Sequence, residues 1–416
     1  MYNHIIAIIP FLRAGADKSL KGSPAGPGIC PGFSFPRMRN IIFRMDKENL
    51  VKITQLRHRL HQCAELSGRE RETGRLLREF LKDNTSLEII EKNGWFYAVK
   101  RGADLKAGSI AFRADMDALP IEESIPLPYA SLHAGVSHKC GHDGHSAALC
   151  GLALELDVLA PAKTVYLLFQ KAEEIGKGGK YCAAFIKETG ISEVYAFHNL
   201  NGFPVSSIVY RRGLTQPASE GLELRFLGKT SHASAPEDGR NPAAAIAETV
   251  LYAERLLQER YNGMVLCTVT GIQAGTGDFG ISAGEGSLRM TLRAEYEADM
   301  ALLLDKILAF ARACADKAGL KTEHAIFDYF PETRNSDFGI RRVLAAADRL
   351  HLKTVEMEKL WRASEDFGYC LKECPGAMFY IGTGEHYPAL HTKEYDFNDR
   401  ILETAADMFL TLAQTE

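Results

Sequence analysis

Apolar residues recur at helical spacing directly after Met45. The first stripe comprises Leu50, Ile53, Leu56 and Leu60, and a second stripe covers residues 76–81. Side chains three and four positions apart share one face of a helix. Both stretches therefore predict amphipathic helices with one buried side.

Short apolar runs then alternate with helical stretches. Strands are expected at residues 109–112, 165–169 and 194–197, and helices at residues 147–159 and 181–186. Because strands that alternate with helices form largely parallel sheets covered by those helices, this part of the chain predicts an α/β domain.

The order of elements changes after about Ser219. The pattern predicts a strand at 221–227, a helix from Asn241-Pro242 to about Arg260, strands at 265–272 and 287–296, a helix at 299–317 and a strand at 322–329. This β-α-β-β-α-β order is typical of a ferredoxin-like α+β unit.

The α/β pattern resumes at Thr333. A helix is expected at 340–350, a glycine-rich strand end at 380–384 and a closing helix from Arg400. We therefore predict a discontinuous α/β domain with a mostly parallel sheet, formed by residues 46–213 and 333–416. The ferredoxin-like unit, residues 214–332, is inserted in it.

The first 44 residues differ in composition from the rest of the chain. They contain five prolines, five glycines and six basic residues against one acidic residue. Such a segment cannot bury enough apolar surface to offset its ordering entropy. We predict that residues 1–45 are a disordered tail, or a non-native extension that precedes a true start at Met45. The alternative is a signal or transit peptide, although the positive charge of a secretory amino end is missing.

Composition excludes several classes of partner. The 416 residues are 46% hydrophobic and 25% charged, which is ordinary for a globular protein with a sizeable core. A formal net charge of -4 gives no electrostatic reason to expect nucleic acid or an anionic membrane. The apolar run at 5–12 is too short to span a bilayer. Nine scattered cysteines predict reduced thiols and a cytoplasmic location.

Metal-ligating and acid–base residues concentrate at five places where strands of the α/β domain should end. These places are Arg113–Asp117, Cys140–His145, Glu173-Glu174, His198 and His391. Open α/β sheets bind their ligands at the carboxyl ends of the strands. Because all five places follow predicted strands of the same sheet, we predict that they form one shared site.

Two of these groups have the chemistry of a metal-dependent hydrolase. Cys140 and His142 lie two positions apart in a glycine-containing loop, so both side chains can turn the same way before a helix starts and bind zinc or a similar ion. Glu173 and Glu174 diverge at a strand end, so one can face a metal and the other a water molecule. The alternatives are a buried cysteine beside a helix-capping histidine, and a solvated carboxylate pair. His145 is expected to support the helix start.

Taken together, five motifs resemble the two-metal amidohydrolases of the aminoacylase and carboxypeptidase superfamily. The branch they resemble most contains hippurate hydrolase, indole-acetyl-amino-acid hydrolases and aminobenzoyl-glutamate hydrolase. The motifs are Arg113–Pro120, His138–His145, Gln170–Glu174, Ser364–Phe367 and Leu390–Asp399. They follow the family's order, and the Cys-Gly-His-Asp-Gly-His segment is specific to this branch.

The resemblance implies two divalent metal ions, with zinc or manganese as the first candidates and cobalt or nickel as the others. The implied ligands are Cys140, His142, Glu174, His198 and His391. Glu173 takes the position of the general base, and His232 that of a histidine that the inserted unit presents to the substrate. Arg293 is a weaker match to an arginine near the substrate carboxylate. Asp115 and Asp117 correspond to carboxylates that orient metal ligands.

The implied activity is hydrolysis of the amide bond of N-acetyl, N-benzoyl or aminobenzoyl amino acids by metal-activated water. The resemblance also implies a small-molecule substrate and a homodimer joined through the inserted unit, with His232 acting in cis or in trans. The alternatives are an N-acetyl-diaminopimelate-type deacetylase and a non-catalytic metal-binding dimeric scaffold, against which the intact Glu173 argues. Lys171 replaces a usual proline and Thr230-Ser231 replaces paired glycines, and both departures bear on the substrate's identity.

Overall fold

The computed structural model describes residues 44–104 and 106–415. The predictions for the amino-terminal extension therefore fall almost wholly outside the described residues. The two amphipathic helices predicted after Met45 are present as α1 (Lys47–Gln62) and α2 (Arg71–Asn84). The side chain of Asp46 caps α1 by accepting a hydrogen bond of 2.7 Å from the backbone N–H of Glu48.

An eight-stranded sheet forms the centre of the α/β domain. Its strands, in spatial order, are β1 (Glu88–Glu91), β2 (Phe96–Lys100), β4 (Thr164–Gln170), β3 (Ser109–Asp115), β5 (Glu193–Asn201), β16 (Gly376–Gly384), β6 (Ile208–Tyr210) and β15 (Thr354–Glu356). The central strands β4, β3, β5 and β16 run parallel to their neighbours in this group, whereas β1 and β2 add antiparallel to one side. The predicted α/β fold with a largely parallel sheet is confirmed.

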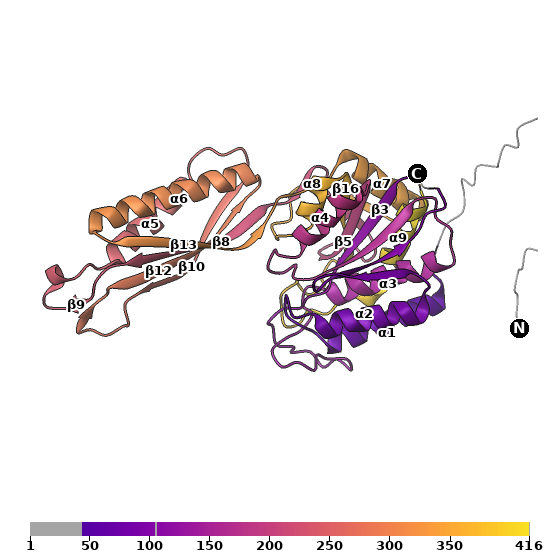
Figure 1. Ribbon diagram of the computed structural model, residues 1–416, viewed down its shortest axis with the longest axis horizontal. Coiled ribbons are helices and arrows are strands. Elements are labelled where there is room, and N and C mark those ends of the chain that lie inside the picture. The colour runs from indigo at the N-terminus through magenta and orange to yellow at the C-terminus, as the bar shows by residue number, and fades with distance from the viewer. Residues whose placement is uncertain (1–43, 105, 416) are drawn as a thin grey trace, which may run out of the picture. The chain divides into compact units, whose positions relative to one another are not determined.

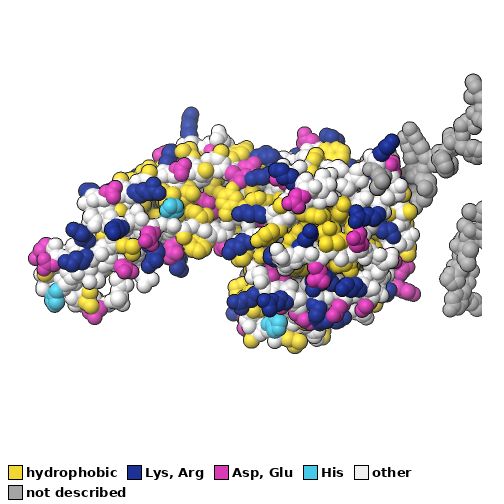
Figure 2. Space-filling model, in the orientation of Figure 1, with side chains coloured by type: hydrophobic (Ala, Val, Ile, Leu, Met, Phe, Trp, Pro, Cys, Tyr) yellow, Lys and Arg dark blue, Asp and Glu magenta, His cyan; other side chains and the backbone are white. Residues whose placement is uncertain are grey.

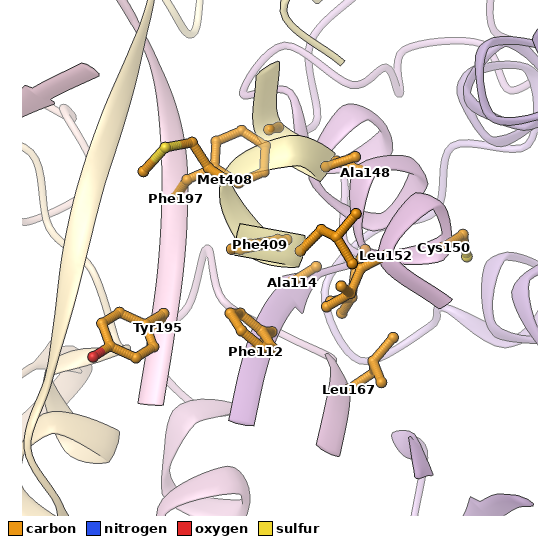
Figure 3. Close-up of a cluster of buried hydrophobic side chains, with 14 of the residues drawn as sticks. Phe112, Ala114, Ala148, Cys150, Leu152, Leu167, Tyr195, Phe197, Met408 and Phe409 are labelled. Atoms are coloured by element: carbon orange, nitrogen blue, oxygen red, sulfur yellow. The ribbon is translucent and has the colours of Figure 1, made fainter. Parts of the chain in front are cut away.

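Helices cover both faces of this sheet (Figure 1). One face packs against α1, α2, α3 (His142–Asp157), α7 (Asp337–Arg349) and α9 (Leu402–Gln414). The other packs against α4 (Gly179–Thr189) and α8 (Gly368–Glu373). In the core between the sheet, α3 and α9, the ring centroids of Phe112 and Phe409 lie 4.9 Å apart (Figure 3). Because helices bury both faces of the sheet, the sequences of its central strands are continuous apolar runs.

The inserted unit has its own sheet and core. It contains β8 (Ala218–Leu227), α5 (Ala243–Leu256), β10 (Val265–Ala274), β12 (Glu285–Ala294), α6 (Glu297–Ala318) and β13 (Lys321–Phe330). The sheet order β10-β12-β8-β13 is antiparallel throughout, and α5 and α6 pack on one face. This is the predicted ferredoxin-like order. Two short strands, β7 (Leu214–Gln216) and β14 (Thr333–Arg334), pair where the chain enters and leaves the unit.

The distribution of charged side chains on the surface and the apolar character of the helices are relevant to which partners the chain could bind. Acidic and basic side chains are intermixed over the face drawn in Figure 2. Within the described ranges, no helix has both the length and the apolar character needed to cross a membrane.

Candidate metal centre

Three adjacent strands bring the predicted site residues together. Strand β3 ends at Asp115, β4 is followed after three residues by Glu174, and β5 carries His198. Because β4, β3 and β5 are parallel neighbours, their carboxyl ends meet at one edge of the sheet. His391 arrives from the loop after β16, where its backbone N–H donates a hydrogen bond of 2.8 Å to the carbonyl of Lys139.

The five predicted metal ligands converge on a single point. The Sγ atom of Cys140 lies 3.3 Å from Nε2 of His198 and 3.4 Å from Nε2 of His391. The Oε1 atom of Glu174 lies 3.6 Å from Nε2 of His391 and 3.7 Å from Nε2 of His142. Five side chains at these separations can hold metal ions, since each offers one sulfur, nitrogen or oxygen donor to the same small space.

Helix α3 begins at His142, whereas the apolar pattern predicted its start at Ala147. The expectation that both Cys140 and His142 precede the helix is therefore wrong for His142. The residues at the start of α3 are buried whatever their polarity, so they carry no amphipathic signal. Gly141 makes the turn into the helix with a φ of 103°.

Replacement of Gly141 with alanine is expected to lower the free energy of unfolding by about 2–5 kcal/mol. The new Cβ would overlap Oδ1 of Asn199 and lie 2.8 Å from the hydroxyl of Tyr395, in a backbone region that disfavours side chains. Urea denaturation measures the loss. Gly190→Ala is the matched control, since φ there is 69° but no atom lies within 4 Å, and a loss of only about 1–2 kcal/mol is expected. Equal losses in the two variants would contradict the steric argument.

Backbone carbonyls orient two of the imidazoles. Nδ1 of His142 donates to the carbonyl of Asp117 at 2.9 Å, and Nδ1 of His198 donates to the carbonyl of Asn199 at 2.8 Å. With the proton on Nδ1, the lone pair of each Nε2 faces the cluster. Burial lowers the pKa of His198 well below its usual range, which keeps this ring neutral.

Asp117 and Asp115 lie behind the ligands. Asp117 accepts hydrogen bonds from the backbone N–H groups of Glu173 at 3.1 Å and Glu174 at 2.9 Å. Asp115 contacts Nη1 of Arg113 at 2.6 Å and Nδ1 of His145 at 2.7 Å. Both aspartates thus hold the segments that carry the donor atoms. The two ring nitrogens of His145 lie 2.7 Å from Oδ1 of Asp115 and 2.6 Å from Oδ1 of Asn199.

The donor atoms fit a divalent cation. Nε2 of His142 and Oε1 of Glu174 are buried and have no hydrogen-bond partner among the described residues. Burial raises the pKa of Glu174 to about 7. Burial and the neighbouring carboxylates also raise the pKa of the Cys140 thiol well above its usual range. Burial thus disfavours both anionic forms unless a cation binds beside them, and a thiolate–imidazole–carboxylate set is one that zinc and related ions bind.

Glu173 is a second carboxylate beside this donor set. Its Oε2 lies 3.9 Å from Nε2 of His142, and its side chain is buried. Burial, followed by the charges of Glu365 and Glu174, raises the pKa of Glu173 well above its usual range. A carboxylate with a raised pKa next to a metal site can take up a proton and return it.

A cavity of about 540 Å³ opens onto the cluster. Cys140, Glu173, Glu174, His198 and His391 line one side of it, and Arg293 from β12 lines another. Nη1 of Arg293 donates to the carbonyl of Arg362 at 2.9 Å and to Oγ of Ser364 at 2.7 Å. A second hollow of about 590 Å³, on the sheet of the inserted unit, holds none of the predicted ligands.

His232 is not part of this cavity within the chain. It lies on the short strand β9 (Ser231–His232), which pairs with β11 (Ile281–Ser282). Its side chain is exposed, and Nδ1 lies 2.7 Å from Oγ of Ser234. The structure thus brings together the predicted ligands, the predicted base and Arg293, but leaves His232 apart from them.

Several residues around the site were not assigned a role from the sequence. Arg57 of α1 is fully buried, and its Nη1 lies 2.8 Å from Asp396 and 3.5 Å from Asp143, so it joins the loop of His391 to the start of α3. The ring of Trp361 meets that of His198 edge to face at 5.1 Å. A lone arginine on a helix stripe or a lone tryptophan in a loop carries no pattern that a single sequence could reveal.

The fold and the cluster together define a metal-dependent hydrolase, because buried thiol, imidazole and carboxylate donors meet beside a free carboxylate at the edge of an α/β sheet. The sequence model of Peptidase family M20/M25/M40 matches residues 111–415, and the chain belongs to this family.

Individual relatives agree with this assignment. The chain is 29% identical over 380 residues to an N-acetylcysteine deacetylase from Bacillus subtilis (strain 168), covering 88% of this chain and 97% of that protein. It is 26% identical over 358 residues to an N-acetyldiaminopimelate deacetylase from Lacticaseibacillus paracasei, covering 83% and 93%. A dinuclear metal-binding M20-family peptidase from Bacillus subtilis is similar in structure, with a TM-score of 0.75 and 27% identity over 88% of this chain and 98% of that one. The superfamily predicted from the motifs is confirmed.

Proposed function

We propose that this protein hydrolyses the amide bond of N-acyl amino acids. The observation that carries the proposal is the buried carboxylate of Glu173 directly beside five converging donor residues, on a cavity that also exposes Arg293. Both curated relatives named above are deacetylases of N-acetyl amino acids, so the acetyl group is the first candidate acyl group. N-benzoyl and aminobenzoyl substrates, which the motif resemblance suggests, are the second.

The cluster would hold two divalent metal ions, as in the dinuclear relative. We assign them to Cys140, His142, Glu174, His198 and His391, with Asp115 and Asp117 orienting these ligands. The metals would polarise the amide carbonyl and lower the pKa of a water molecule towards ~7. Zinc and manganese are the first candidates for the native metal, because soft thiolate and imidazole donors are mixed with a carboxylate.

Glu173 is the proposed general base. It accepts the proton of the attacking water and returns it to the nitrogen of the leaving amine, which must be protonated to depart. Arg293 pairs with the carboxylate of the amino acid and so orients the scissile amide. His232 donates a hydrogen bond to the carbonyl oxygen as negative charge develops there.

We further propose that residues 46–213 and 333–416 form the catalytic domain and 214–332 a lid that also joins two subunits. The position of His232 outside the cavity supports a homodimer in which each lid supplies this histidine to the partner's site. The eight described cysteines, all free, agree with a cytoplasmic location. The alternative of a non-catalytic scaffold is disfavoured by Glu173, because a structural metal site needs no base.

The activity test is a panel of N-acetyl, N-benzoyl and aminobenzoyl-glutamate substrates. The protein is first treated with a chelator and then supplied with Mn²⁺, Zn²⁺, Co²⁺ or Ni²⁺, and the release of free amine is measured. We expect release that depends on added metal and is fastest for an N-acetyl amino acid. Absence of hydrolysis across the panel, in protein shown to contain bound metal, would contradict the proposal and favour the scaffold.

Cys140 is expected to be shielded from thiol reagents by bound metal. The metal occupies its sulfur, so chelation should accelerate modification of Cys140 by at least about tenfold, as followed by peptide mass spectrometry. Cys150 is the internal control, because it is a buried cysteine within α3 and lies outside the donor cluster. Equal labelling rates with and without metal, together with full activity of Cys140→Ser, would contradict its assignment as a ligand.

A further inference from the structure

One short segment, Ser364–Asp366, contacts both the substrate side and the base side of the cavity. Its first residue bonds to the inserted unit, and its next two residues each place a carboxylate oxygen within 4.8 Å of one of Glu173. The sequence marks the segment only as part of a family motif and assigns it no role.

The hydroxyl of Ser364 is the contact with the inserted unit. It lies 2.7 Å from Nη1 of Arg293 on β12 and 2.6 Å from Oγ of Ser219 on β8. Arg293 also donates to the carbonyl of Arg362 at 2.9 Å. Two bonds through the same Nη1 fix the orientation of the guanidinium, and no carboxylate of the described residues pairs with it.

The following carboxylates surround the proposed base. One oxygen each of Glu173, Glu365 and Asp366 lies within 4.8 Å of the others, and all three side chains are buried. Arg113 pairs with two of the three carboxylates. Its Nη2 lies 2.9 Å from Asp366 and 3.1 Å from Glu365.

Arg113 also ties the segment to the ends of the strands. Its Nε donates to Oε1 of Gln170 at 3.0 Å, and its Nη1 lies 2.6 Å from Asp115. Gln170 ends β4 and precedes Glu173 by three residues, while Asp115 ends β3 behind the metal ligands. A fully buried guanidinium with four polar partners has little conformational freedom. A shift of Ser364–Asp366 would therefore move Arg113 and, with it, the end of β4 that leads to Glu173.

We propose that Ser364 is a positioning residue that joins recognition of the substrate carboxylate at Arg293 to the placement of Glu173, through Glu365, Asp366 and Arg113. The inference rests on the proposed function, in which Arg293 binds that carboxylate. Binding energy gained at this remote group then serves the reacting centre, so a substrate without the carboxylate loses kcat and not only affinity.

The test compares N-acetyl-L-methionine with its C-terminal primary amide, which keeps the scissile bond but lacks the negative charge. Wild-type protein, loaded with the most effective metal of the panel, is expected to show a kcat at least about tenfold higher for the acid. Ser364→Ala should lower kcat for the acid about tenfold while changing kcat for the amide less than about twofold.

Further variants distinguish a positioning role of Ser364 from a non-specific loss of structure. Arg293→Ala should show the same loss for the acid, and the double variant should lose no more than either single variant, because both act through one link. Ser364→Thr retains the hydroxyl and should recover most of the kcat. Ser207→Ala removes another buried hydroxyl, which donates to the carbonyl of Pro204, and should behave as wild type. Unfolding midpoints establish that all variants are folded.

Two results overturn the link while the proposed function stands. One is equal loss for acid and amide in Ser364→Ala, and the other is a rise in KM alone with kcat unchanged. If wild-type protein hydrolyses neither compound although it contains metal, the proposed function fails for this substrate class and the link, which rests on it, fails with it.

Discussion

Replacement of Glu173 with glutamine is expected to reduce kcat by about 10²–10⁴-fold and to leave the metal content near that of wild type. The amide keeps the shape of the side chain but cannot accept the proton of water. Glu173 is also not among the residues assigned as metal ligands, although its Oε2 lies only 3.9 Å from Nε2 of His142. Elemental analysis after dialysis and a steady-state assay measure the two quantities.

Glu174→Gln should give the opposite pattern. Its Oε1 is a buried acceptor without a hydrogen-bond partner in the described part of the chain, and it lies 3.6–3.7 Å from two imidazole nitrogens. Loss of its negative charge should weaken metal binding by more than about tenfold, with activity partly restored by excess metal. Glu188→Gln, an exposed substitution of the same kind on α4, is the control. Metal loss in Glu173→Gln and metal retention in Glu174→Gln would reverse the two assignments.

A mixture of Glu173→Ala and His232→Ala subunits is expected to recover roughly a quarter of wild-type activity. Each variant alone should be nearly inactive. If His232 acts in the partner's site, a heterodimer contains one intact site of two, and random pairing makes half of the dimers heterodimers. The subunits are mixed under conditions that allow exchange, and activity is followed with time at constant total protein.

The same mixture distinguishes the two routes for His232. If each lid closes over its own site, every site keeps one lesion and the mixture stays as inactive as its parents. Light scattering provides an independent check, because a monomer at assay concentrations is incompatible with action in trans. His232 is exposed on β9 and is absent from the lining of the cavity, which is why we expect the trans result.

Local patterns in the sequence predicted most of the longer elements. Strands β3, β4 and β5 were expected because buried parallel strands appear as apolar runs, and α5 and α6 because one face of each is apolar. Strands β1, β2, β6 and β15 of the large sheet were missed. They contain four, five, three and three residues, which is too short for a clear periodicity to appear.

The residue types in the motifs predicted which side chains would lie close together. Thiol, imidazole and carboxylate groups that follow several strands of one sheet seldom serve a structural role alone. The motifs could not show how these side chains meet. Cys140 and His391 are 251 positions apart, and their contact depends on β16 lying next to β5 in the sheet. The contacts of Arg113 with Asp366 and of Arg57 with Asp396 likewise span 253 and 339 positions.

The type of chemistry, the order of most elements and the candidate donor residues are therefore contained in the sequence, because helix periodicity, strand burial and ligand type are properties of neighbouring residues. The folded chain adds the distances among donors, the link from Arg293 through Ser364 to Glu173, and the separation of His232 from the cavity. These features arise from the pairing order of strands and the packing of loops far apart in the chain. Such long-range contacts depend on the whole fold and leave no short-range pattern from which they could be inferred.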